Sequence, residues 1–194
     1  ERNMERIKDS ELILNPDGSI YHLNLKPEDI AHDIIFVGDQ DRVVAVTRYF
    51  DTIEFTKQKR EFKTQTGTYK GKRLTVISTG IGPDNIDIVL NELDALVNID
   101  FKTKTVNKSY TQLNIVRIGT SGSLQKDIPV DSLLMSAAAI GTDNMLRSYH
   151  LENVSNSDIE TKFINHTNWD ASKGLPYVID ADADLRDKFN EEHI

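Results

Sequence analysis

Three apolar runs of strand length each lead directly into a loop that contains glycine, and this pattern limits the possible folds more than any other feature. The runs end in FVGDQDR (36–42), ISTGIGPDN (77–85) and RIGTSGS (117–123). Buried parallel strands read as continuous apolar runs, and ligands bind such sheets beyond the carboxyl ends of the strands. We therefore expect the three loops to converge at one edge of a sheet.

One segment between these runs has helical periodicity. From Asp84 to Val97 apolar residues recur three and four positions apart, and Pro83 suits the first turn of a helix. Strands that alternate with a crossover helix predict an α/β fold with a mixed central β-sheet flanked by helices. Further elements are predicted as strands within 51–80, a hairpin turn in TGTYKGKR (66–73), a strand in VDSLLMSAAAIG (130–141) and the start of a helix in DADADLRDKFNEEH (180–193).

Length and charge narrow the class of protein. The 194 residues can bury a core, and we expect a single domain over residues 1–194. A formal net charge of -8 argues against non-specific binding to nucleic acid or to anionic membranes. The polar start ERNMERIKDS has no apolar signal-peptide core, and the run LLMSAAAIG is too short to cross a membrane, so we expect a cytoplasmic protein.

Several partial motifs favour structural roles. The segment GIGPDN (80–85) has Asn85 where the dinucleotide fingerprint needs a third glycine. In GTSGS, Gly122 directly follows Ser121, which is the wrong spacing for a nucleophile elbow; a serine hydrolase that uses Ser121 stays an alternative from another class. The acidic residues of DADADLRDKFNE favour helix capping over a calcium loop, because Leu185 stands where that loop needs glycine. No metal site is predicted, since the chain has no cysteine and its five histidines are scattered.

Two arginines lie beside the glycine loops. Arg42 follows Gly38 by four residues, and Arg117 leads directly into GTSG. A guanidinium group binds phosphate through two parallel hydrogen bonds, and a glycine loop exposes backbone N–H groups to an anion. An arginine inside an apolar strand also needs a partner for its charge. From the residues alone we expect an oxyanion pocket for phosphate.

The same segments resemble a known family. VGDQDRV (37–43), REF (60–62), STGIGPDNIDIVLNEL (78–93) and RIGTSGSLQ (117–125) occur in this order and at similar spacings in nucleoside phosphorylases of the uridine and purine type. YHLNL (21–25) resembles the FHLGL segment of uridine phosphorylases. The resemblance runs from about Asp17 to Asp143 and fades beyond it.

The resemblance implies a pentosyltransferase that catalyses reversible phosphorolysis. Inorganic phosphate, the co-substrate, would attack C1′ of a nucleoside to give free base and ribose 1-phosphate, with no other cofactor. The family also implies a homo-oligomer built from dimers, up to a hexamer, with shared active sites. Carried over by motif, the phosphate would be held by Gly38, Arg42, Arg117 and Thr120, of which Arg42 and Arg117 are catalytic, and by Arg60 of a neighbouring subunit, while His22 would contact the ribose 5′-hydroxyl across the interface.

Three departures from the family pattern affect these expectations. Gln40 stands where many relatives have proline, which should loosen the loop. Glu61 matches a position that in some uridine phosphorylases helps bind a monovalent cation between subunits, and Asn85 replaces the serine found there, so this cation site stays undecided. The base-recognition segment and the Met-Glu pair for the ribose hydroxyls have no counterpart, so we expect a fold that is incomplete at the C-terminus.

The choice of base stays open at this stage. REF, YHLNL and Thr120 favour uridine, while TGTYKGKR is closer to the purine enzymes. Uridine is the favoured substrate and purine nucleoside phosphorolysis the alternative. A module that binds phosphate or nucleoside without turnover is a further alternative.

Overall fold

The computed structural model describes residues 5–191. The chain divides into two compact units, the first ending at Ser121 and the second beginning at Gly122, and each is described by itself. The expected single domain therefore stays a prediction. Among the helices of residues 5–191, none combines the length and the apolar character needed to cross a membrane.

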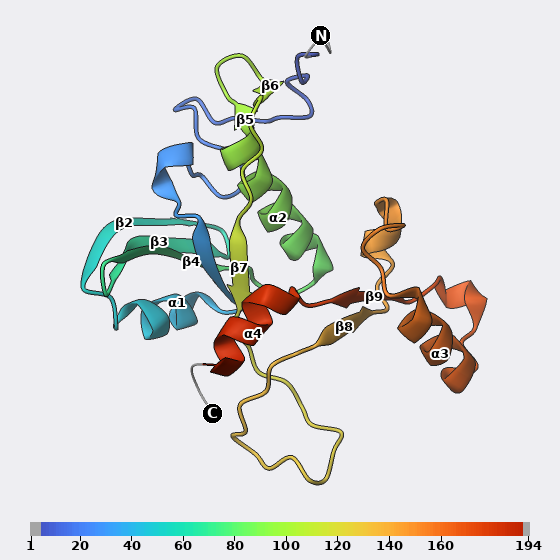
Figure 1. The fold of residues 1–194 in the computed structure, drawn as a ribbon. Helices are drawn as coiled ribbons and strands as arrows, with labels where there is room; N and C mark the ends of the chain where they lie inside the picture. Colours follow the sequence, from blue (N-terminus) through green and yellow to red (C-terminus); the bar gives the residue numbers. More distant parts are fainter. Residues whose placement is uncertain (1–4, 192–194) are drawn as a thin grey trace. The chain divides into compact units, whose positions relative to one another are not determined.

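The first unit is built on a five-stranded mixed sheet with the strand order β2-β3-β4-β1-β7 (Figure 1). β1 is parallel to both β4 and β7, whereas β3 is antiparallel to β2 and to β4. This arrangement confirms the predicted α/β class. The elements of the sheet and its helices are β1 (Asp33–Val37), α1 (Gln40–Thr47), β2 (Thr52–Lys59), β3 (Phe62–Tyr69), β4 (Lys72–Ser78), α2 (Pro83–Asn98) and β7 (Asn114–Arg117).

The two helices cover opposite faces of this sheet because successive strand residues point to opposite sides. Ile34 and Phe36 of β1 belong to the core cluster that also contains Leu93 of α2. Val37 of β1 belongs to a second cluster with Val43 of α1. The predicted helix over 84–97 is confirmed, and its apolar stripe forms one side of the main core.

Two tight turns connect the antiparallel strands. Lys70 and Gly71 both have positive φ, +47° and +77°, which is the conformation of a type I′ hairpin turn and confirms the turn predicted in 66–73. The second turn joins β2 to β3 through Arg60 and Glu61, and Arg60 has a φ of +54°. Arg60 therefore lies at the tip of a hairpin.

The connections before β1 and β7 are partly ordered by local contacts. The short helix η1 (Pro27–Asp29) precedes β1, and the short strands β5 (Ile99–Asp100) and β6 (Thr105–Val106) pair after α2. At the start of β1, a hydrogen bond from Asn114 and an ion pair with Lys72 hold the pKa of Asp33 below its usual value.

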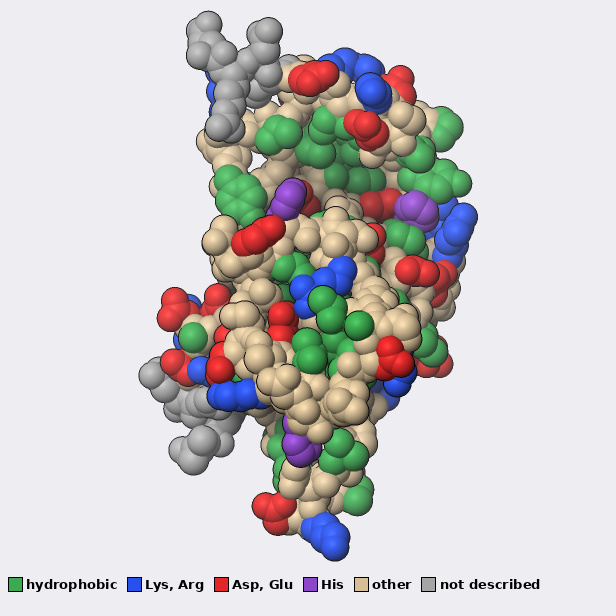
Figure 2. Space-filling model, turned by 90° about the vertical axis from the view of Figure 1, so that its right-hand side faces the viewer, with side chains coloured by type: hydrophobic (Ala, Val, Ile, Leu, Met, Phe, Trp, Pro, Cys, Tyr) green, Lys and Arg blue, Asp and Glu red, His purple; other side chains and the backbone are tan. Residues whose placement is uncertain are grey.

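The second unit contains a two-stranded antiparallel sheet and two α-helices. The strand predicted over 130–141 forms only at its end, because residues 130–137 have no ladder partner in the described chain; Leu133 is fully exposed. Hydrophobic side chains reach the surface among charged ones (Figure 2). The elements are β8 (Ala138–Gly141), η2 (Met145–Ser148), α3 (Ser157–Thr167), η3 (Ala171–Lys173), β9 (Tyr177–Asp180) and α4 (Ala183–Glu191).

The second unit also contains a helix near its end and a buried tyrosine. The helix predicted to start in 180–193 is confirmed as α4, and residues 192–194 lie outside the described residues. Tyr177 is buried and donates a hydrogen bond of 2.7 Å to Asp143. Burial and this carboxylate raise the pKa of Tyr177 to about 12.

Candidate active site

The three glycine loops meet at one edge of the sheet. β4, β1 and β7 are adjacent and parallel, so their carboxyl ends lie side by side (Figure 1). The backbone N–H of Gly80 donates to the carbonyl of Gly38 over 2.9 Å, and that of Ile118 donates to the carbonyl of Phe36 over 2.9 Å. The loops are thus fixed to one another by main-chain hydrogen bonds, as the sequence pattern predicted.

The Arg117 guanidinium lies over the glycines of two of these loops. Its Nη1 is only 2.1 Å from the position that a Cβ on Gly119 would occupy, and its Nη2 is 3.8 Å from the corresponding position on Gly38. Arg117 is exposed, and within residues 5–121 no carboxylate forms an ion pair with it. The guanidinium charge of Arg117 is therefore not buried within the strand. Arg117 is the last residue of β7, and its side chain is accessible to an anion at that end of the strand.

Arg42 and Thr120 both follow the carboxyl ends of adjacent parallel strands, β1 and β7. α1 begins at Gln40, directly after β1, and its N-cap Asp39 accepts a hydrogen bond from the Asp41 N–H. This cap places Arg42 in the first turn, where its side chain is exposed. Thr120 is exposed in the loop after β7. The structure thus brings Arg117 against Gly38, with Arg42 in the first turn of α1 and Thr120 in the loop after β7.

Gln40 links the first loop to the β2–β3 hairpin. Its Nε2 donates to the carbonyl of Arg60 over 2.7 Å, and its Oε1 accepts from Gln58 over 2.8 Å. We expected glutamine in place of proline to loosen the loop. Two side-chain hydrogen bonds hold the loop against the hairpin instead, and they tie the backbone of Arg60 to the start of α1.

Glu61 and Asn85 face each other across Gly80, where the family's cation site would lie. Gly80 has a φ of +72°, and a Cβ there would come within 2.8 Å of both side chains. Asn85 Nδ2 donates to the carbonyl of Ile81 over 3.0 Å, so this carbonyl is already engaged by an N–H donor. The cation that the resemblance implies would lie between two subunits, so a role of Glu61 toward it stays a prediction. No catalytic step is assigned to a cation.

His22 is held by a carboxylate that the sequence analysis missed. Glu92 of α2 accepts hydrogen bonds from the N–H groups of His22 and Leu23, and lies 2.6 Å from His22 Nδ1. The signal for this contact was a glutamate beside Leu93 in the apolar stripe of α2. Within residues 5–121, His22 forms no hydrogen bond with Gly38, Arg42, Arg117 or Thr120 of its own chain.

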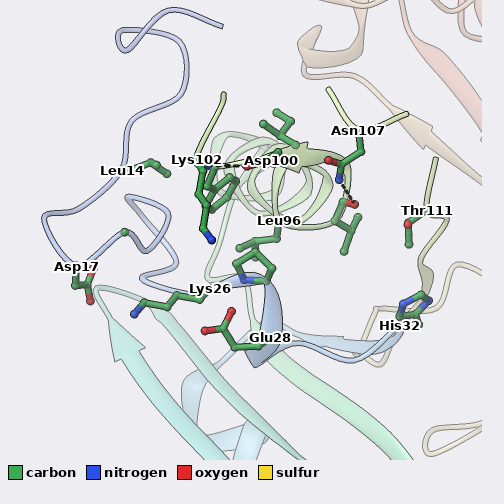
Figure 3. Close-up of a pocket in the computed structure, with 15 residues that line it drawn as sticks. Leu14, Asp17, Lys26, Glu28, His32, Leu96, Asp100, Lys102, Asn107 and Thr111 are labelled. Atoms are coloured by element: carbon green, nitrogen blue, oxygen red, sulfur yellow. Dashed lines mark hydrogen bonds between the residues drawn. The ribbon is translucent and has the colours of Figure 1, made fainter. Parts of the chain in front are cut away.

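A cavity of about 720 Å³ lies at the opposite edge of the same sheet. It is lined by His32, which precedes β1, by Thr111, which precedes β7, and by Leu96 near the end of α2 (Figure 3). None of the predicted site residues lines it. Because ligands of parallel sheets bind at the carboxyl ends of the strands, the glycine-loop edge is the better candidate for chemistry.

The position of Arg117 over Gly119 gives a direct prediction. Gly119→Ala should push the guanidinium away from Gly38 and lower activity with phosphate by about tenfold or more, comparable with misplacing a catalytic group by an ångström. Stability should change by less than about 0.5 kcal/mol, since only the end of an exposed side chain must move. Gly122→Ala is the matched control, because a Cβ on Gly122 meets no atom within 4 Å. Equal activities of the two variants would contradict this geometry.

Comparison with known proteins agrees with this arrangement. The family model of the phosphorylase superfamily matches residues 33–193. Uridine phosphorylase of Thermococcus kodakarensis is 29% identical over 146 residues, which are 75% of this chain and 48% of that protein. A DeoD-type purine nucleoside phosphorylase of Bacillus thuringiensis is 33% identical over 127 residues, 65% of this chain and 48% of that protein.

A solved structure extends the similarity to the fold. A Trypanosoma brucei nucleoside phosphorylase, described as showing uridine phosphorylase activity, superposes with a TM-score of 0.82 and 32% identity over 93% of this chain and 61% of that one. The chain spans about half the length of the curated relatives it matches. With the family model covering most of the sequence, the chain belongs to the phosphorylase superfamily, in the branch of the nucleoside phosphorylases.

Proposed function

We propose that this protein acts as a nucleoside phosphorylase, with uridine as its favoured substrate. The observation that carries the proposal is the Arg117 guanidinium, which lies over Gly38 and Gly119 and has no carboxylate partner within residues 5–121. A guanidinium group that lies over glycine backbone at the carboxyl ends of three parallel strands can bind a doubly charged phosphate.

The proposed reaction needs only inorganic phosphate as co-substrate. A phosphate oxygen forms a bond to C1′ while the bond from C1′ to the base nitrogen breaks, and the base leaves with the electron pair and takes up a proton. Positive charge develops on the sugar, so an anion fixed beneath C1′ stabilises the transition state. Arg42, Arg117 and Thr120 would hold that phosphate together with the backbone of Gly38.

Two residues are proposed to serve a neighbouring subunit. Arg60 at its hairpin tip would reach the neighbour's phosphate, and His22 would contact the 5′-hydroxyl of the neighbour's nucleoside. Such shared sites require a homo-oligomer, which we expect to be built from dimers. We also expect the protein to be cytoplasmic and to act in nucleoside salvage. A fully active monomer in light scattering would rule out shared sites.

The choice of uridine over a purine nucleoside rests on the names of the similar proteins. The Thermococcus protein is named a uridine phosphorylase and the Trypanosoma protein is described with that activity, whereas the Bacillus relative is a purine enzyme. YHLNL and REF add to the case for uridine. Purine nucleoside phosphorolysis is the second candidate.

The test is an assay of the complete natural chain with uridine, thymidine, inosine and adenosine, with and without phosphate. We expect release of uracil that depends on phosphate and exceeds release of any purine. Turnover of inosine or adenosine ahead of uridine would favour the purine alternative. Binding without turnover would favour a binding module and overturn the proposal.

A serine hydrolase would instead release base without phosphate and lose activity in Ser121→Ala. The geometry of the first unit does not favour it. Within the described part of that unit, neither His22 nor His32 forms a hydrogen bond with Ser121, and His22 Nδ1 is occupied by Glu92. Neither histidine of that unit is therefore held as a general base for Ser121.

A further inference from the structure

Glu92 is a buried carboxylate to which the proposed mechanism gives no role. It lies on α2, is 9% exposed, and is set among the apolar residues Val89 and Leu93. Burying a charge is unfavourable unless hydrogen bonds compensate it. The hydrogen bonds that compensate the Glu92 carboxylate come from His22 and Leu23, about seventy residues away in the sequence. Glu92 therefore fixes this segment of the chain.

Within the described part of the first unit, Glu92 accepts hydrogen bonds from two backbone N–H groups and lies against one ring nitrogen. Its Oε1 accepts from the His22 N–H over 2.9 Å and lies 2.6 Å from His22 Nδ1, while Oε2 accepts from the Leu23 N–H over 2.8 Å. An ionised carboxylate has no hydrogen to donate, so the short contact requires the hydrogen to be on Nδ1. In the neutral ring Nε2 then carries a free lone pair and can accept a hydrogen bond.

The other side of the same segment is anchored as well. The ammonium of Lys59 donates to the carbonyl of Tyr21 and to Asn15 Oδ1, and it lies 4.4 Å from the centre of the Tyr21 ring. Tyr21 in turn packs edge-on against the His22 ring, with the centroids 4.8 Å apart. Lys59 directly precedes Arg60, so one set of contacts holds together the two residues proposed to serve the neighbouring site.

The His22 side chain remains 30% exposed despite these contacts. Its Nδ1 edge is fixed on Glu92, which leaves Nε2 as the ring nitrogen available to a ligand. A hydroxyl group is the partner that matches a lone pair at this position.

We propose that Glu92 is a positioning residue that fixes the tautomer and orientation of His22, so that Nε2 accepts a hydrogen bond from the 5′-hydroxyl of the nucleoside. This inference rests on the proposed function. It adds a specificity determinant: the enzyme distinguishes nucleosides with a 5′-hydroxyl from those without one through a contact that Glu92 maintains.

The test compares uridine with 5′-deoxyuridine in the complete natural chain and its Glu92→Gln variant. A neutral hydrogen bond to the 5′-hydroxyl should give uridine a roughly three- to tenfold advantage in kcat/KM. Glu92→Gln should remove that advantage, mostly through KM, and leave 5′-deoxyuridine unchanged. In a His22→Ala background, Glu92→Gln should have no further effect, because both changes remove the same contact.

Asp94→Asn is the matched control. Asp94 is an exposed carboxylate on the same helix, and its Oδ1 accepts from Asn98 over 2.8 Å, a bond that asparagine can keep. Both substrates should be turned over by this variant as by the unaltered chain. An equal loss for both substrates in Glu92→Gln, with a lowered melting temperature, would show a merely structural role and overturn the proposal.

A spectroscopic measurement separates this inference from the proposed function. In ¹⁵N NMR spectra of the histidine rings, His22 should show the Nδ1–H tautomer, and Glu92→Gln should shift it toward Nε2–H. A His22 that already has the hydrogen on Nε2 overturns the inference even in an active phosphorylase. Absence of phosphorolysis in the unaltered chain would instead overturn the proposed function, and the tautomer would still report on the contact.

Discussion

Arg117→Ala is expected to lower kcat/KM for phosphorolysis by roughly 30- to 1,000-fold, which corresponds to ~2–4 kcal/mol of transition-state stabilisation. The reason is the position of the guanidinium over Gly38 and Gly119, where it would meet the phosphate that attacks C1′. Steady-state kinetics with phosphate as the varied substrate measure the effect. Arg117→Lys should recover only part of the loss, because an ammonium group cannot form two parallel hydrogen bonds.

Arg48→Ala is the control for this prediction. Arg48 follows the last turn of α1 at the other end of the helix from Arg42, and its guanidinium binds the hydroxyl of Tyr49. It should leave kinetics unchanged while removing the same charge from the chain. An Arg117→Ala enzyme with normal dependence on phosphate and full activity would show that Arg117 does not hold the nucleophile.

Phe62→Ala is expected to destabilise the protein by ~3–5 kcal/mol, the cost typical of truncating a buried aromatic side chain. Phe62 is 1% exposed in the main core and directly follows the turn that carries Arg60. Its loss should therefore both lower the midpoint of unfolding and free the hairpin tip. Urea unfolding followed by circular dichroism gives the free energy of unfolding and its change.

Tyr110→Ala provides the comparison, since Tyr110 is 78% exposed and an exposed truncation should cost less than about 0.5 kcal/mol. A change of less than 1 kcal/mol in Phe62→Ala would mean that the hairpin is not anchored by this core. The position of Arg60 would then need another explanation.

Local patterns in the sequence predicted most of the first unit. The helix from Asp84 to Val97 and the turn at Lys70 and Gly71 follow from periodicity and turn chemistry, which act over a few residues. The meeting of the three glycine loops follows from one further rule, the alignment of parallel strand ends. That Arg117 and Gly38 lie at the same edge of the sheet was predictable on this basis, although the contact between them was not.

Contacts between distant residues were not predictable in the same way. The glutamate in the apolar stripe of α2 indicates a buried carboxylate that needs a partner, but Glu92 and His22 are seventy positions apart and neither local pattern identifies the other residue as that partner. The two hydrogen bonds of Gln40 depend on a hairpin whose tip the sequence did not locate. The strand predicted from 130 formed only over 138–141, because a strand needs a neighbour as well as apolar residues.

The most direct test of the central claim is the fate of isotopically labelled oxygen during turnover of uridine by the complete natural chain. With ¹⁸O-labelled phosphate in ordinary water, we expect mass spectrometry to find ribose 1-phosphate that keeps every labelled oxygen. With unlabelled phosphate in ¹⁸O water, we expect no label in the sugar. Free ribose that carries one oxygen from water would mean that water and not phosphate is the nucleophile, and the protein would then not be a phosphorylase.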